Sequence, residues 1–160
     1  MSSNAATAFS VYLRNVLNKR KDSGLVWEKN WHGIGGETAD VAAISLKGKD
    51  KRAKVIVEVE RLREDPASNV VKIWSWMLKD RIPRNALFIH AFTKPYLGRK
   101  KASKERAALV ATKGMLLQFG QARYEQVQMA LNPRHGARGI GGASQRHAKK
   151  LASRITKLLK

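Results

Sequence analysis

Cysteine is absent from this 160-residue chain, and its absence excludes disulfide bonds, zinc–thiolate sites and cysteine nucleophiles. Long apolar runs are absent too. No stretch of 18 consecutive apolar residues occurs, so the sequence predicts no membrane-spanning helix. An apolar signal core is also lacking, and the expected location is therefore the cytoplasm.

Acidic residues are scarce: 12 Asp and Glu stand against 32 Lys and Arg, for a formal net charge of +20. The imbalance is uneven, since residues 94–160 carry 16 basic and 2 acidic residues, whereas residues 1–93 carry 16 and 10. A basic field of this size predicts a polyanionic partner, and nucleic acid ranks well above an anionic membrane. The predicted phosphate contacts come from Lys94, Arg99, Lys100, Lys101, Arg134, Arg138, Arg146, Lys149 and Lys150.

The hydrophobic fraction of 43% over 160 residues is enough for one domain with a real core. Apolar periodicity predicts helices over about residues 5–21, 65–79, 104–119 and 145–160. Strands are predicted over 25–31, 41–46, 55–59, 86–92 and, less clearly, 123–131. The order indicates an α/β domain over 1–131, followed at 132–160 by a basic glycine-rich linker and an amphipathic tail helix.

The strands at 41–46 and 55–59 form a predicted β-hairpin that carries acids at its open end: Asp40, Glu58 and Glu60. Glu58 and Glu60 share one face because strand side chains alternate. A turn centred on residue 49 or 50 places Asp40 opposite Glu58 or Glu60, on their face, while a one-residue slip turns it away. The favoured registers predict that three acids converge.

Two readings of these acids compete. They are either solvated at a sheet edge, or they surround a divalent cation, because close carboxylates repel one another and hard Mg²⁺ prefers oxygen ligands. Both strands are otherwise apolar on both faces, which is typical of a sheet covered on both sides and favours the second reading. The expected cofactor is Mg²⁺, or Mn²⁺ in its place.

A helix, three strands, a helix and a buried strand, with Asp40 at the start of one strand and VIVEVE (55–60) in the next, resemble the PD-(D/E)XK nuclease superfamily. The resemblance covers about residues 5–92 and includes Asn69 and Lys72 of the following helix. It implies a restriction-endonuclease-like αβββαβ core, in which a mixed central sheet is flanked by helices, with the basic C-terminal helical extension outside it. It also implies Mg²⁺-dependent hydrolysis of phosphodiester bonds, with DNA favoured over RNA.

Asp40 and Glu58 are the metal ligands that the resemblance implies, and Glu60 stands where the family usually has Lys. The resemblance leaves three roles open for Glu60: it acts as a base, it binds a second ion, or it marks an inactive site.

Lys72, on the following helix, is a candidate to supply the positive charge that the family's lysine provides. However, it falls opposite the predicted buried stripe (Val70, Ile73, Trp74, Met77 and Leu78), so a solvated side chain is favoured. Asn69, near the helix start, is better placed to touch the site.

Three functions remain open from the sequence. The favoured one is a Mg²⁺-dependent endonuclease with Asp40, Glu58, Glu60, Asn69 and Lys72 as catalytic candidates. The alternatives are a non-catalytic nucleic-acid binder on an inactive nuclease fold and a component of a ribonucleoprotein particle. A homodimer that cuts both strands of a duplex is one arrangement that the sequence leaves open. His90, within an apolar strand, is predicted to be a hydrogen-bonded core residue.

Overall fold

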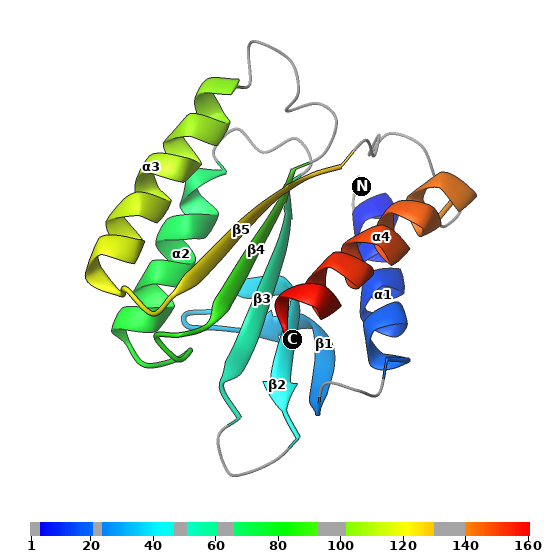
Figure 1. Cartoon of the computed structure of the whole chain (residues 1–160), viewed down its shortest axis with the longest axis horizontal. Coiled ribbons are helices and arrows are strands. Elements are labelled where there is room, and N and C mark those ends of the chain that lie inside the picture. The colour runs from blue at the N-terminus through cyan, green and yellow to red at the C-terminus, as the bar shows by residue number, and fades with distance from the viewer. Residues whose placement is uncertain (1–3, 21–23, 47–50, 61–65, 93–101, 130–139) are drawn as a thin grey trace.

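A computed structural model describes residues 4–20, 24–46, 51–60, 66–92, 102–129 and 140–160 of the chain. Figure 1 shows a central sheet between two pairs of helices, α1 with α4 and α2 with α3. In chain order the elements are α1 (Asn4–Asn18), β1 (Leu25–His32), β2 (Thr38–Ser45), β3 (Ala53–Glu60), α2 (Ala67–Leu78), β4 (Leu87–Phe92), α3 (Ala102–Gln118), β5 (Arg123–Gln128) and α4 (Gly142–Leu158).

The protein is an α/β protein with a mixed five-stranded sheet, and the strands follow one another in the order β1-β2-β3-β4-β5. The first three strands pair antiparallel, while β4 is parallel to β3 and β5 is parallel to β4. Each parallel step needs a crossover, which α2 and α3 provide. The predicted order of helices and strands is confirmed for all nine elements, including the strand that begins at Arg123.

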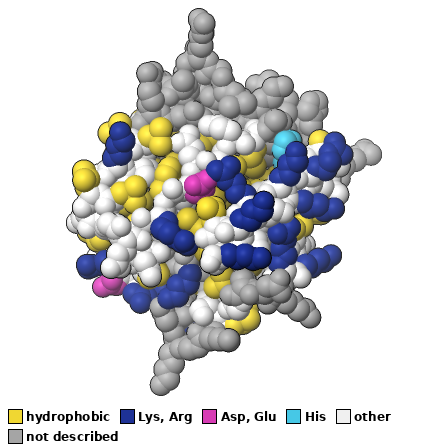
Figure 2. Space-filling view, in the orientation of Figure 1, with side chains coloured by type: hydrophobic (Ala, Val, Ile, Leu, Met, Phe, Trp, Pro, Cys, Tyr) yellow, Lys and Arg dark blue, Asp and Glu magenta, His cyan; other side chains and the backbone are white. Residues whose placement is uncertain are grey.

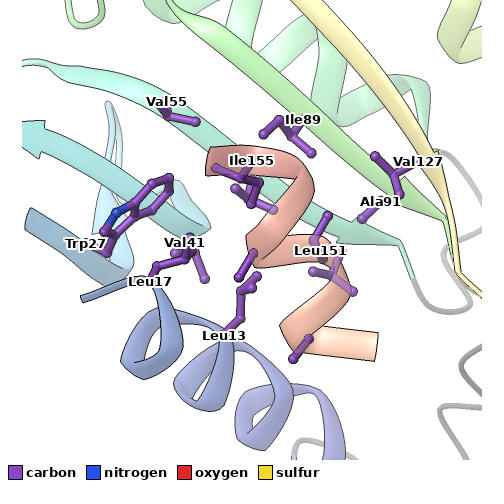
Figure 3. Packing of buried hydrophobic residues seen from close by; sticks show 14 of the residues in the cluster. Leu13, Leu17, Trp27, Val41, Val55, Ile89, Ala91, Val127, Leu151 and Ile155 are labelled. Atoms are coloured by element: carbon purple, nitrogen blue, oxygen red, sulfur yellow. The ribbon is translucent and has the colours of Figure 1, made fainter. Parts of the chain in front are cut away.

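Strands β3 and β4 are nearly continuous apolar runs because helices cover both of their faces. On one face, Val41, Val55 and Ile89 pack under α1 and α4. Figure 3 shows Leu13 and Leu17 of α1 and Leu151 and Ile155 of α4 turned toward these strands. The tail helix therefore contributes to the core: the stripe predicted for it is buried at Ala148, Leu151 and Ile155.

The opposite face of the sheet packs against α2 and α3. Here Ile56 and Phe88 of the sheet meet Val70, Ile73 and Trp76 of α2. The predicted stripe of α2 is partly wrong, because Trp76 is fully buried whereas Trp74 is only partly buried and Leu78 is exposed. The face that meets the sheet is thus rotated toward residues 69, 73 and 76, and this rotation determines where Lys72 points.

None of the helices in the described part of the chain has the length and apolar character needed to cross a bilayer.

Candidate functional site

Asp40 and Glu58 lie next to each other on β2 and β3. The register pairs Val41 with Val57, so Asp40 and Glu58 form the next pair along the ladder, as one of the two favoured registers predicts. The Asp40 Oδ2 atom accepts a hydrogen bond of 2.8 Å from the backbone N–H of Val59. This bond fixes the Asp40 carboxylate against β3, beside Glu58.

Lys72 reaches this pair from α2. Its Nζ donates to Oε1 of Glu58 at 2.8 Å and to the carbonyl oxygen of Thr38 at 2.9 Å. The Lys72 side chain is only 11% exposed, and its Nζ lies 5.4 Å from the ring centroid of Trp76. The expectation of a solvated Lys72 is therefore wrong. The reason is the rotation of α2, because burial of Trp76 one turn later carries Lys72 to the sheet side.

Glu58 is nearly inaccessible, with 4% of its surface exposed. Burial raises the pKa of its carboxyl from 4.5 to about 8, and the neighbouring Asp40 carboxylate also raises it, whereas Lys72 acts in the opposite direction. The environment therefore disfavours the anionic form of Glu58, even with one ammonium group beside it. A further positive charge at this position would stabilise the carboxylate.

Glu60 faces a different set of partners. Its Oε1 atom accepts a hydrogen bond from Nδ2 of Asn69 and lies 2.7 Å from Nε2 of His90. His90 Nδ1 is 3.1 Å from the hydroxyl of Tyr124 on β5. A neutral imidazole that donates from Nε2 accepts at Nδ1, so the Tyr124 hydroxyl is the donor in that arrangement. The predictions that Asn69 reaches the acids and that His90 is a hydrogen-bonded core residue are confirmed.

The chemistry of Asp40 and Glu58 fits a magnesium ion. Both offer carboxylate oxygens, and Mg²⁺ is commonly held by one or two carboxylates together with water and substrate phosphate. Within the described residues, no group of three or more His, Asp and Glu side chains is arranged to hold a metal ion. The pair that fits is thus Asp40 with Glu58, while the Oε1 atom of Glu60 is engaged by His90 and Asn69.

One contact next to the site was not predicted from the sequence. The turn between β1 and β2 rests on α2, because Trp76 Nε1 donates to Oε2 of Glu37 at 3.0 Å. Gly33 lies directly against the Trp76 indole, and the turn is closed by a hydrogen bond of 2.8 Å from Gly33 N to Glu37 O. A glycine-rich segment indicates a turn, but its docking partner cannot be inferred from the pattern alone.

The predicted phosphate contacts divide into two groups. Arg146, Lys149 and Lys150 are exposed on α4, which lies on the opposite side of the sheet from α2 and its Lys72 (Figure 1). The others, Lys94, Arg99, Lys100, Lys101, Arg134 and Arg138, lie outside the described residues.

Comparisons of the chain with protein-family models, with curated proteins and with solved structures gave no match.

Proposed function

We propose that this protein is a Mg²⁺-dependent nuclease that hydrolyses phosphodiester bonds in DNA. The observation that carries the proposal is the cluster of Asp40, Glu58 and Lys72. Two carboxylates from neighbouring strands stand beside an ammonium group whose Nζ is 2.8 Å from Glu58. Two acids and a lysine are the side chains that the PD-(D/E)XK resemblance requires, with the lysine supplied here by α2 instead of by β3.

The order of elements supports the same family. From α1 to β4 the chain runs helix, three strands, helix, strand, which is the αβββαβ order that the resemblance implies. The proposed restriction-endonuclease-like core thus comprises α1, β1, β2, β3, α2 and β4, with the acids on its two central strands.

Each side chain of the cluster has a separate task in the proposed reaction. Asp40 and Glu58 would hold the Mg²⁺ ion, which when bound polarises the scissile phosphate and makes a water molecule more acidic. Lys72 uses two of its three N–H donors on Glu58 and on the Thr38 carbonyl. The third donor is left for a phosphate oxygen or for the attacking water. In the reaction the water oxygen gives up one proton and bonds to phosphorus while one P–O ester bond breaks, and the leaving oxygen takes up one proton.

Glu60 has a supporting task in this scheme. Its hydrogen bonds to His90 and Asn69 tie the end of β3 to β4 and to α2. These bonds fix the strand that carries Glu58 relative to the helix that carries Lys72. Glu60, Asn69 and His90 are thus positioning residues in this scheme, and Asp40, Glu58 and Lys72 are the groups that meet substrate or metal.

The decisive experiment is cleavage of a supercoiled plasmid in Mg²⁺ or Mn²⁺ by the wild type, Asp40→Asn and Glu58→Gln. We expect both substitutions to lower the rate at least 100-fold, because each removes a negative ligand from a two-carboxylate site. Glu28→Gln is the matched control, since Glu28 is exposed on β1 and loses the same charge. Equal cleavage by all four proteins would refute the site.

The same assay distinguishes a nuclease from a non-catalytic nucleic-acid-binding protein. A wild type that binds DNA tightly and cleaves neither DNA nor RNA in either metal would be a non-catalytic nucleic-acid binder. Preference for RNA, tested with duplexes of the same sequence, would overturn the choice of DNA as substrate.

A further inference from the structure

The layer formed by α1 and α4 is basic, and the two helices contain no acidic residue that would offset their positive charge. Helix α4 carries Arg146, Lys149, Lys150, Arg154 and Lys157, and neither helix contains an Asp or Glu. Figure 2 shows Lys and Arg side chains gathered over this layer, on the right half of the view. This positively charged helix layer lies across the sheet from Lys72.

A groove of about 700 Å³ opens where the two helices meet. Its lining includes Tyr12 and Asn15 of α1, Lys19 and Arg20 directly after α1, and Lys149 of α4. Arg20 joins the two sides, because its guanidinium donates to Oγ of Ser153 at 2.9 Å and to Oγ1 of Thr156 at 3.2 Å. The hydrogen bonds of Arg20 thus fix the segment directly after α1 against α4, and they hold the two sides of the groove together.

The cations of this groove have no acidic partner within the described part of the chain. Among the residues that the structure describes, Arg154 of α4 pairs with Glu125, but no acidic side chain pairs with Lys19, Arg20 or Lys149. Three positive groups around one concave surface attract an anion, and the amide of Asn15 and the hydroxyl of Tyr12 offer hydrogen bonds to it.

The chemistry favours nucleic acid over a membrane surface. A helix that binds a bilayer presents an apolar face to it, whereas the apolar face of α4 is buried against α1 and the sheet at Leu151 and Ile155. The large apolar side chains that are exposed in the described part of the chain all lie off α1 and α4: Leu46, Val71, Leu78, Leu109, Val110 and Leu117.

We propose that the groove between α1 and α4 binds the phosphodiester backbone of nucleic acid, as a contact surface separate from the Asp40–Glu58–Lys72 cluster. A segment in the groove is separated from the acids by the full thickness of the sheet, so it is a different segment from the one at the cluster. The proposal shares a ligand with the proposed function but does not require cleavage. It gives the protein two nucleic-acid surfaces, one on each side of the sheet.

The test measures binding of the full chain to a fluorescent 30-base-pair DNA duplex in EDTA, over a series of salt concentrations. The variant is Lys19→Glu/Lys149→Glu. The control is Lys79→Glu/Lys113→Glu, which changes the net charge equally at exposed positions at the end of α2 and on α3. We expect the groove variant to raise Kd at least tenfold and the control less than threefold. The slope of log K against log salt should become shallower by about 2 in the groove variant, because each lost phosphate contact removes about 0.9.

Two further measurements make the result decisive. Lys19→Gln/Lys149→Gln replaces the double reversal if the latter lowers the thermal melting temperature, and it should still raise Kd more than Lys79→Gln/Lys113→Gln. Wild type is also mixed with phosphatidylserine vesicles at the same ionic strength. Equal loss of DNA binding in groove and control variants, or binding to vesicles in preference to DNA, would overturn the proposal. Absence of cleavage by the wild type would refute only the proposed function.

Discussion

The Glu60 carboxylate and the His90 imidazole lie 2.7 Å apart, between Oε1 and Nε2, on the parallel strands β3 and β4. Both side chains are almost completely buried, at 1% and 0% exposure, and Phe88 and Phe92 flank the imidazole ring. A polar pair in such apolar surroundings is stable only while each partner satisfies the other.

Truncation of Glu60 should therefore cost much more than its isosteric replacement. Glu60→Ala removes the oxygen that accepts from Nδ2 of Asn69 and pairs with Nε2 of His90, and we expect the free energy of unfolding to fall by about 3 kcal/mol. Glu60→Gln keeps an oxygen acceptor and the side-chain volume, so the expected loss is about 1 kcal/mol. Urea denaturation measures both values. Glu28→Ala, at an exposed position, should change stability by less than about 0.5 kcal/mol. Equal losses for Glu60→Ala and Glu60→Gln would contradict the assigned bonds.

Removal of the Lys72 ammonium should affect the chemical step more than DNA binding. In Lys72→Met the site loses the donor next to Glu58 but keeps both carboxylates, so single-turnover cleavage at saturating DNA should slow at least 100-fold. The affinity for DNA should stay within threefold, since this ammonium is largely buried. Lys79→Met, at an exposed position directly after the same helix, is the control and should cleave like the wild type. Wild-type cleavage by Lys72→Met would remove Lys72 from the reaction.

The raised pKa of Glu58 predicts how stability depends on pH in the absence of metal. The folded protein holds this proton up to about pH 8, whereas the unfolded chain releases it near 4.5. Unfolding therefore releases a proton between these values, and the contribution of Glu58 to stability, complete below pH 4.5, is lost as pH rises through about 8. In EDTA, the melting temperature of Glu58→Gln should gain on that of the wild type as pH increases from 5 to 8. Glu28→Gln should follow the wild type, and parallel curves for all three proteins would show that the Glu58 carboxyl is not buried as described.

The sequence predicted the features of the fold and site that depend on a two-residue period. Strand side chains alternate between the two faces, so Glu58 and Glu60 share a face, and a turn centred on residue 49 or 50 brings Asp40 to that same face. The predicted hairpin therefore placed Asp40 opposite either Glu58 or Glu60, and the register of the structure selects Glu58. The nine elements followed from similar patterns, because apolar spacing and turn residues identify them locally.

The rotation of α2 could not be predicted in the same way. Trp74 and Trp76 are both large and apolar, and either one completes a plausible helical stripe with Ile73. The choice depends on the space that Gly33 and Trp31 leave for the Trp76 indole, which is a tertiary contact. This contact turns Lys72 toward Glu58. Because the contact cannot be inferred from the helical pattern, the sequence predicted a solvent-exposed lysine. The Glu60–His90 bond likewise depends on the register of two parallel strands whose connection includes α2.

Gly33 provides the sharpest test of this dependence. A Cβ atom on Gly33 would lie 2.1 Å from Cζ2 of Trp76, and the indole cannot retreat easily because it is fully buried and bonded to Glu37. We expect Gly33→Ala to reduce the free energy of unfolding by about 2–3 kcal/mol through overpacking. Cleavage should fall as well, since Trp76 and Lys72 share one face of α2. Gly120→Ala is the matched control, because nothing lies within 4 Å of its added Cβ. Equal urea midpoints for the two variants would mean that the turn after β1 does not rest on Trp76, and the orientation of Lys72 would lose its physical cause.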